Sequence, residues 1–181
     1  MLNTILGSFS SGVVAAVGDY ESIATVTGTG SASTLSFTSI PSDYTHLQIR
    51  GINNDTLGYF VAATFNSDTA ANYTIHQLYG DGSSIAAFGL ANTNYIYAGV
   101  AGYSSSSMVA PMIMDILDYK NTNKFKTCRM LTGNDSNGTN TGYIQFNSGV
   151  WRSTSAITRI DLTLTGNFSS TATFALYGIK G

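Results

Sequence analysis

The sequence predicts an all-β fold, namely an antiparallel two-sheet sandwich of jelly-roll type with an extended N-terminal arm. The first observation is that apolar and polar residues alternate with period two through most of the chain. In residues 46–50, for example, Leu47 and Ile49 would point to one face of a strand and Gln48 to the other. The second observation is that no segment keeps a helical period for longer than a turn or two, which disfavours a parallel α/β architecture.

Eleven strands are expected, each bounded by residues that favour turns. In chain order they span residues 22–27, 34–39, 46–52, 59–66, 73–79, 95–101, 112–119, 125–131, 143–147, 157–165 and 172–179. Turn residues such as Pro, Gly, Asn and Asp gather in residues 40–43, 80–83, 121–123 and 134–138. Ile157 and Ile160 stand three apart in one predicted strand, and this spacing favours a β-bulge there over burial of both faces.

The first 18 residues form a different kind of segment, because they combine apolar and small side chains with no charge. We expect residues 1–18 to be an N-terminal arm and residues 19–181 a single β-sandwich domain. An apolar arm free in water would aggregate, so it should lie against its own domain or against a partner subunit. The predicted assembly contacts are its apolar side chains: Leu2, Ile5, Leu6, Phe9, Val13, Val14 and Val17.

The chain contains few charged residues, and this disfavours some classes of function. Only 10% of the 181 residues are Asp, Glu, Lys or Arg, and the net charge is −2, which argues against binding to nucleic acid or to an anionic membrane. The apolar content of 43% is still sufficient for a core. No apolar run approaches the length of a membrane span, and no secretory signal is recognisable. A single cysteine excludes an internal disulfide.

Few residues could perform chemistry, and none stands in a recognised motif. His46 and His76 lack the spacing of a zinc site, so both should be structural or surface residues. Cys128 alternates with Lys126 and Met130, which suits a small half-buried filler better than a nucleophile. We therefore expect no enzyme, no cofactor and no metal site.

The acidic residues lead to the same expectation. Asp115 and Asp118 are three apart, which places them on opposite faces of a strand, and Asp115 should form a salt bridge with Lys126 or Arg129 of the neighbouring strand. Asp135, with Asn137 and Gly138, faintly resembles a calcium loop, but the closing glutamate of that motif is absent.

Aromatic residues offer a further possibility, as stacking platforms for sugars or flat anchors for protein contacts, although in a sandwich such residues more often form core and rim. They are Tyr59, Tyr73, Tyr79, Tyr95, Tyr97, Tyr103, Tyr143 and Trp151.

Four stretches are familiar when taken together. They are residues 19–26 (DYESIATV), 39–51 (SIPSDYTHLQIRG), 115–127 (DILDYKNTNKFKT) and 174–181 (FALYGIKG). They resemble a family of virion structural proteins of tailed phages, common among phages of cyanobacteria and other aquatic bacteria. The resemblance implies a particle component built as a β-sandwich and often trimeric, either a capsid decoration (cement) protein or a part of the tail and fibre apparatus. It carries over no catalytic residue.

The resemblance and the composition together predict a non-enzymatic virion structural protein, assembled in the bacterial host cytoplasm. The first expectation is a capsid decoration protein, a homotrimer that binds the major capsid protein or other virion proteins on the outer shell and stabilises the assembled state. One short domain leaves no room for the shaft that a self-standing fibre needs.

Two alternatives stay open. A tail or fibre component would contact a host surface glycan through loops such as residues 80–86, 103–107 and 134–143. A glycan-degrading enzyme would need paired carboxylates, and these could come only from loop residues that converge in the fold. The candidates are Asp43, Asp55, Asp68 and Asp81.

Overall fold

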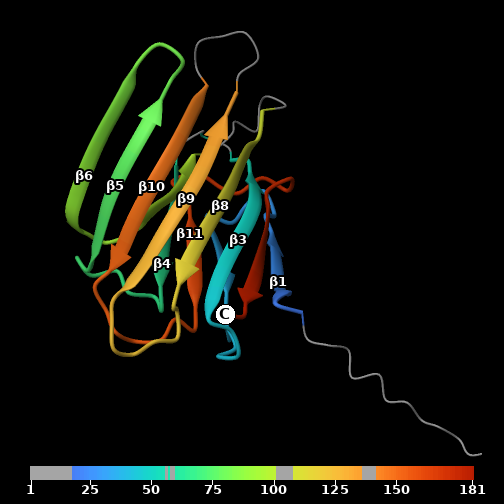
Figure 1. Cartoon of the computed structure of the whole chain (residues 1–181). Helices are drawn as coiled ribbons and strands as arrows, with labels where there is room; N and C mark the ends of the chain where they lie inside the picture. Colours follow the sequence, from blue (N-terminus) through green and yellow to red (C-terminus); the bar gives the residue numbers. More distant parts are fainter. Residues whose placement is uncertain (1–17, 56, 58–59, 101–107, 136–141) are drawn as a thin grey trace, which may run out of the picture.

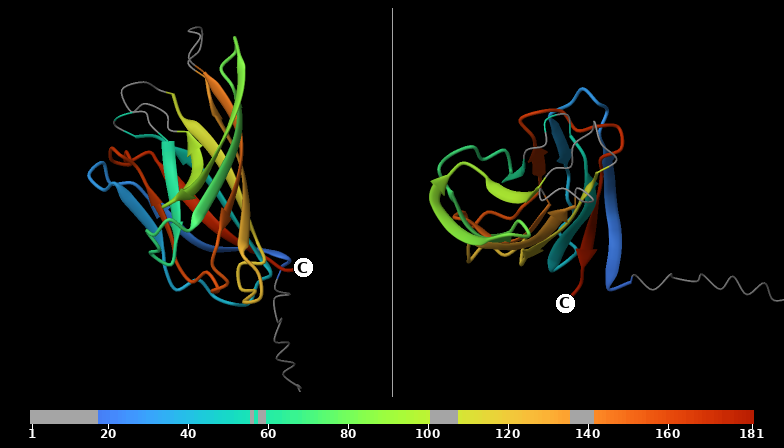
Figure 2. Two further views of the ribbon diagram at one scale, coloured as in Figure 1. Left: turned by 90° about the vertical axis from the view of Figure 1, so that its left-hand side faces the viewer. Right: turned by 90° about the horizontal axis from the view of Figure 1, so that it is seen from above.

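Twelve antiparallel strands form two sheets in the described part of the chain, and the two sheets lie face to face (Figures 1 and 2). The computed structural model describes residues 18–55, 57, 60–100, 108–135 and 142–181. The strands are β1 (Tyr20–Thr27), β2 (Thr34–Phe37), β3 (His46–Asn53), β4 (Phe60–Phe65), β5 (Tyr73–Gly80), β6 (Ile85–Thr93), β7 (Ile96–Val100), β8 (Ala110–Leu117), β9 (Lys126–Asn134), β10 (Tyr143–Trp151), β11 (Ile160–Thr163) and β12 (Thr173–Ile179). The prediction of an all-β two-sheet sandwich is confirmed.

The strand order is that of a jelly roll with an extended sheet. The large sheet has the order β1-β12-β3-β8-β9-β10-β5-β6, and the small sheet the order β2-β11-β4-β7. The first four strands of the large sheet and the four of the small sheet reproduce the two facing sheets of a jelly roll, with the chain passing repeatedly from one to the other. Two antiparallel pairs, β9 with β10 and β5 with β6, are added beyond β8. The large sheet therefore extends past the framework that the small sheet covers.

One hydrophobic core lies between the sheets and contains residues from both. The large sheet contributes alternate residues of its strands, such as Ile49 and Met114, and the small sheet contributes Phe37 and Phe65. The small-sheet strand β7 contacts β8, β9, β10 and β5, so it is the element that faces the added strands.

Two buried tyrosines of this core form hydrogen bonds through their hydroxyl groups. The Tyr44 hydroxyl donates a hydrogen bond to Glu21 at 2.7 Å, and its ring lies against Gly178. Tyr73 is fully buried, and its hydroxyl accepts a hydrogen bond from the Phe65 N–H at 3.0 Å. The hydrogen bond to Glu21, together with burial, raises the pKa of Tyr44 to about 12, and burial raises the pKa of Tyr73 well above its ordinary value.

Stability should consequently fall in alkali. Both tyrosines hold their protons more tightly in the folded state than in the unfolded state, so their contribution is complete below about pH 10 and is lost as the pH rises above it. Each should lower the free energy of unfolding by up to about 1.4 kcal/mol per pH unit in this window. Urea denaturation between about pH 8 and pH 12 measures this slope. The Tyr44→Phe variant should show a shallower slope, and an unchanged slope would exclude Tyr44 as a contributor.

Most of the predicted strands are present, with boundaries shifted by a few residues, but two expectations are wrong. The strand β6 was not predicted. Its first two residues were expected to belong to the loop of residues 80–86, and no strand was expected in the rest of it. The predicted bulge between Ile157 and Ile160 is absent, because β11 begins only at Ile160 and pairs regularly with β2 and β4. Ile157 is buried ahead of the strand, where its N–H donates to the Tyr119 carbonyl at 2.9 Å. The predicted arm contacts at residues 1–17 lie outside the described residues.

Candidate functional site

Part of the large sheet has its polar and apolar faces exchanged. In β10, Asn147 points inward and is fully buried, whereas Ile144 and Phe146 point outward and are 65% and 51% exposed. In the neighbouring strands, Gln77 of β5 and Thr132 of β9 are buried on the inner face, whereas Leu78 and Leu131 beside them are 51% and 49% exposed. We call this part of β5, β9 and β10 the inverted region. Since a half-buried sheet normally turns its apolar residues toward the core, the exchange marks a place where packing alone does not explain the sequence.

The outer side of the inverted region forms a continuous apolar surface. Cross-strand partners share a face, and register places Ile113 opposite Leu131, Leu131 opposite Phe146 and Phe146 opposite Leu78. A second row alongside contains Ile52 in β3, Ile144 in β10 and Ile85 in the edge strand β6. We call the whole surface the outer patch; it consists of Ile52, Leu78, Ile85, Pro111, Ile113, Leu131, Ile144 and Phe146. Contiguous exposed apolar surfaces of this kind mark sites of protein association.

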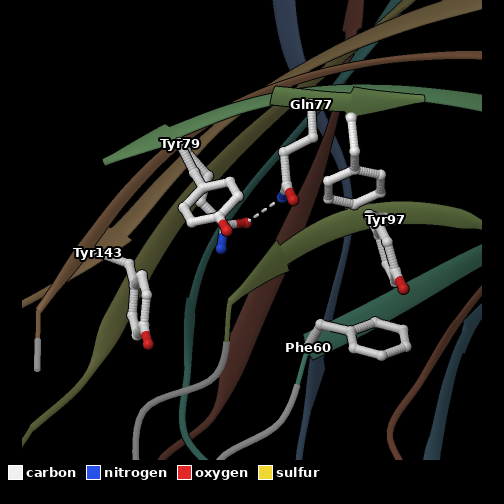
Figure 3. Close-up of a pocket in the computed structure, with 7 residues that line it drawn as sticks. Phe60, Gln77, Tyr79, Tyr97 and Tyr143 are labelled. Carbon is white, nitrogen blue, oxygen red and sulfur yellow. Dashed lines mark hydrogen bonds between the residues drawn. The ribbon is translucent and has the colours of Figure 1, made fainter. Parts of the chain in front are cut away.

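The inner side of the inverted region borders a pocket of about 290 Å³ (Figure 3). Tyr79 and Tyr143 line it from the large sheet, and Phe60 and Tyr97 line it from the small sheet. Of the other aromatic residues predicted as platforms, Tyr73 and Trp151 are core residues, and Tyr95 stacks on Phe60 with ring centroids 5.6 Å apart. Tyr59 and Tyr103 lie outside the described residues.

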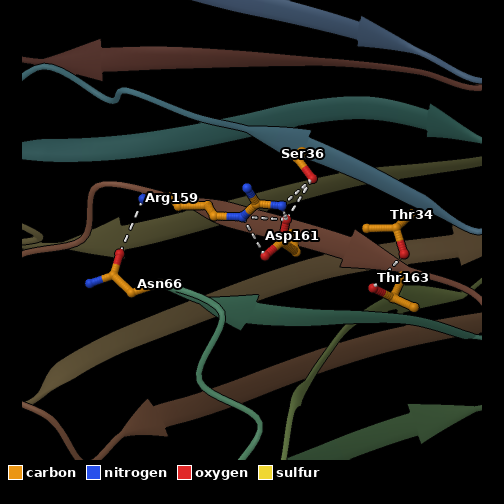
Figure 4. Close-up of polar contacts among 6 residues, drawn as sticks. All are labelled: Thr34, Ser36, Asn66, Arg159, Asp161 and Thr163. Carbon is orange, nitrogen blue, oxygen red and sulfur yellow. Dashed lines mark hydrogen bonds and ion pairs between the residues drawn. The ribbon is translucent and has the colours of Figure 1, made fainter.

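The small sheet provides a contrast over β2 and β11, where its outer face is polar (Figure 4). Arg159 forms an ion pair with Asp161 at 2.7 Å, and Ser36 donates a hydrogen bond to the same carboxylate. Thr34 and Thr163 are joined by their hydroxyls on the next row. Burial opposes ionisation of Asp161, but the hydrogen bonds and the charge of Arg159 prevail and lower the pKa of its carboxyl. This part of the small sheet therefore lacks the apolar outer surface that the outer patch forms on the large sheet.

A polar row borders the outer patch and holds one of the predicted acidic residues. Asp115 pairs in register with Arg129, which in turn lies opposite Ser148. The predicted salt bridge is wrong: Asp115 accepts a hydrogen bond from Gln48 at 2.7 Å and forms no ion pair with another described residue. A neighbouring side chain on its own sheet face supplies the donor instead of a cation.

The other acidic residue of the predicted pair, Asp118, lies just after the end of β8, in the turn that leads to β9. Its carboxylate forms an ion pair with Lys124, and the hydrogen bond from Lys124 lowers the pKa of this carboxyl. His46 lies 3.6 Å from the same carboxylate, and its Nδ1 accepts a hydrogen bond from the Asp118 N–H at 3.0 Å. These contacts are structural. His76 is exposed on the outer face of β5.

Cys128 and Lys126 both face the interior, as their alternation predicts, but both are buried more deeply than expected. Burial raises the pKa of the Cys128 thiol far above its ordinary value, which removes its nucleophilic form. The Lys126 ammonium group is fully buried and donates to three backbone carbonyls, while burial lowers its pKa.

The carboxylates weighed for catalysis or metal binding make local contacts. Asp68 accepts hydrogen bonds from Trp151 and Asn72, and Asp81 accepts them from Ser83 and Ser84 within its own turn. Asp55 is buried and accepts a hydrogen bond from the Leu57 N–H, whereas Asp43 is exposed.

The calcium-like motif is only partly described, since Asn137 and Gly138 lie outside the described residues and only Asp135 lies within them. Among the described residues, no three His, Cys, Asp or Glu side chains gather as a metal site.

Comparison with known proteins adds no assignment. No family, curated protein or solved structure matches this chain. Within the described ranges there is no helix long and apolar enough to cross a membrane.

Proposed function

We propose that this chain is a non-enzymatic structural protein of a tailed-phage virion, and specifically a decoration (cement) protein on the outside of the capsid. The observation that carries the proposal is the outer patch. Six of its side chains are between 47% and 82% exposed, whereas the outer face of β2 and β11 in the small sheet is polar. A contiguous apolar surface of this kind marks a site of contact with a partner. The jelly-roll order supports the same role by analogy, because this architecture is common in viral particles.

The partner that we assign to the outer patch is the capsid shell. The patch is apolar and is bordered by a polar row with both signs of charge, Asp115 and Arg129, which suits a protein surface and not a polyanion. Binding across neighbouring shell subunits would add free energy only to the assembled particle. The predicted homotrimer and the predicted contacts of the N-terminal arm remain part of this proposal.

The test is the binding of purified protein to phage particles that lack it. Replacing Leu131 and Phe146 together by threonine keeps β-propensity but removes two central side chains of the outer patch. Each such side chain contributes about 1.5–3 kcal/mol when it is buried, so binding should weaken at least tenfold. The control replaces Arg129 and His76 by threonine on the same face in the bordering row, and it should bind with nearly normal affinity.

Three further outcomes would overturn the proposal. Equal binding by both double variants would exclude the outer patch as the contact. A change from trimer to monomer on light scattering, with shell binding intact, would assign the patch to contacts between copies. Quantitative mass spectrometry should find hundreds of copies per particle, and a handful of copies confined to the tail would assign the protein to the tail.

A further inference from the structure

The pocket on the inner side of the inverted region contains a pair of glutamine side chains in a position where a sandwich normally places apolar residues. Gln77 of β5 is only 9% exposed, and Gln145 of β10 lies beside it. The Gln77 Nε2 donates a hydrogen bond to the Gln145 Oε1 at 2.7 Å, drawn as the dashed line in Figure 3. This bond fixes both amides. It leaves the Gln77 carbonyl oxygen and the Gln145 amide N–H groups without a hydrogen-bond partner among the described residues.

A third amide lies deeper on the same face. Asn147 is fully buried, and its Nδ2 donates to the Tyr97 carbonyl at 3.2 Å. Its Oδ1 accepts no hydrogen bond from the described residues. Burying polar atoms without partners costs free energy, so three amides on one inner face indicate that this face has a use other than packing.

Aromatic rings complete the pocket on two sides. From the small sheet, Phe60 and Tyr97 meet edge to face with centroids 4.2 Å apart, and Phe88 of β6 meets Tyr97 at 5.9 Å. From the large sheet, Tyr79 and Tyr143 lie 6.4 Å apart. Figure 3 shows the rings of Tyr79 and Tyr143 across the pocket from those of Phe60 and Tyr97. A flat ligand would therefore meet aromatic rings from both sheets.

The chemistry of this lining selects a neutral ligand. The residues lining the pocket include no Asp, Glu, Lys, Arg or His. Burial, assisted by Tyr95, raises the pKa of Tyr97 to about 12, so its hydroxyl keeps its proton. Phosphate or carboxylate groups would find no cation here, which disfavours nucleotides and acidic sugars. A purely apolar ligand would leave the glutamine amides without partners.

We propose that this pocket binds a neutral sugar ring of a glycan. A pyranose has an apolar face of C–H groups that packs on aromatic rings, and hydroxyls that both donate and accept hydrogen bonds. The aromatic rings would hold the face, and the paired amides of Gln77 and Gln145 would bind the hydroxyls. The volume of about 290 Å³ lies at the small end of ligand sites, which suits one sugar unit of a chain and not a long oligosaccharide.

This site is independent of the capsid-binding role. The outer patch and the pocket lie on opposite faces of the same strands, so a particle-bound copy could present the pocket while its outer patch is covered. The pocket lies near the end of β5 and the start of β10. The first and last strands, β1 and β12, pair with each other at the other side of the large sheet.

The experiment uses the purified full chain and a set of methyl glycosides as probes: those of glucose, galactose, mannose, rhamnose, N-acetylglucosamine and N-acetylgalactosamine. Saturation-transfer NMR detects binding, and titration gives the dissociation constant, expected to be of order 1 mM for a single unit. At least one glycoside should bind. Methyl glucuronide and inorganic phosphate serve as anionic probes and should not bind.

Variants locate the site. Gln145→Met keeps the size of the side chain and removes its hydrogen-bonding atoms, and it should weaken sugar binding at least tenfold. Gln48→Met is the matched control, because it makes the same change on the outer face of β3. Tyr79→Phe should retain binding and Tyr79→Ala should lose it, since the ring face and not the hydroxyl is required. Thermal unfolding of each variant identifies any that fails to fold.

The outcomes are decisive in both directions. Binding that is lost in Gln145→Met and kept in Gln48→Met supports the site. Sugar binding that survives in both Gln145→Met and Tyr79→Ala would place the sugar elsewhere and overturn the proposal. Absence of binding by every glycoside well above the millimolar range would overturn it as well, as would preferential binding of the glucuronide or phosphate.

Discussion

Replacing Gly178 by alanine is expected to cost about 3 kcal/mol of stability, at the upper end of the effect of overpacking a core. A Cβ atom at this position of β12 would lie 2.3 Å from two ring atoms of Tyr44. The ring cannot easily move, because the hydroxyl at its far end is hydrogen-bonded to Glu21. Urea denaturation of the variant measures the loss, and Gly178→Val should not fold.

Gly80 provides the control for this prediction. It also lies in a strand of the large sheet, but a Cβ atom there would meet nothing closer than 3.6 Å. Gly80→Ala should therefore change stability by no more than about 0.5 kcal/mol. If the Tyr44 ring is the cause, the cost of Gly178→Ala should shrink in a Tyr44→Ala background, and an undiminished cost would refute the explanation.

Replacing Lys126 by methionine should have an effect of similar size for a different reason. The Lys126 Nζ donates to the backbone carbonyls of Asn121, Lys124 and Thr154 at 2.5, 3.0 and 3.1 Å. It thereby joins the turn between β8 and β9 to the segment that follows β10. Methionine fills much of the same space but leaves the carbonyls unpaired, and each unpaired buried group costs about 1–3 kcal/mol. We expect a net loss of about 3 kcal/mol.

Lys124→Met is the matched control in the same turn. Its side chain is 55% exposed and forms a surface ion pair with Asp118, so its loss should cost no more than about 1 kcal/mol. Equal or greater stability of Lys126→Met, measured by chemical denaturation, would show that the buried ammonium group is replaceable and that the carbonyls find other donors.

The strands could be predicted because alternation identifies them locally, and His46–Asn53 is the clearest case. β6 could not, because its run of Ala, Gly, Leu and Phe does not alternate, and as an edge strand it has no fully buried residue. The bulge between Ile157 and Ile160 was a false signal, since Ile157 is buried from a loop. An apolar residue that is buried from a loop cannot be distinguished in the sequence from one that is buried from a strand.

The candidate sites were harder to predict than the fold. Alternation in β10 separates Ile144 and Phe146 from Gln145 and Asn147, but the usual rule would turn the first pair inward. The structure does the reverse, because the added strands extend beyond the small sheet and enclose a pocket there. The tyrosines were recognised as possible platforms, yet their convergence depends on the contacts of β7 with β5 and β10, which join distant parts of the chain.

The place of β12 in the large sheet has a consequence for how the protein is made. This strand lies between β1 and β3, although it is the last of the described strands to be synthesised. Neither β1 nor β3 can complete its native pairing until residues 173–179 have left the ribosome, so the framework cannot close before then. Such non-local pairing makes folding slow and leaves strand edges open in the meantime. A shortened chain that lacks β12 should consequently accumulate as insoluble material and not as a smaller sandwich.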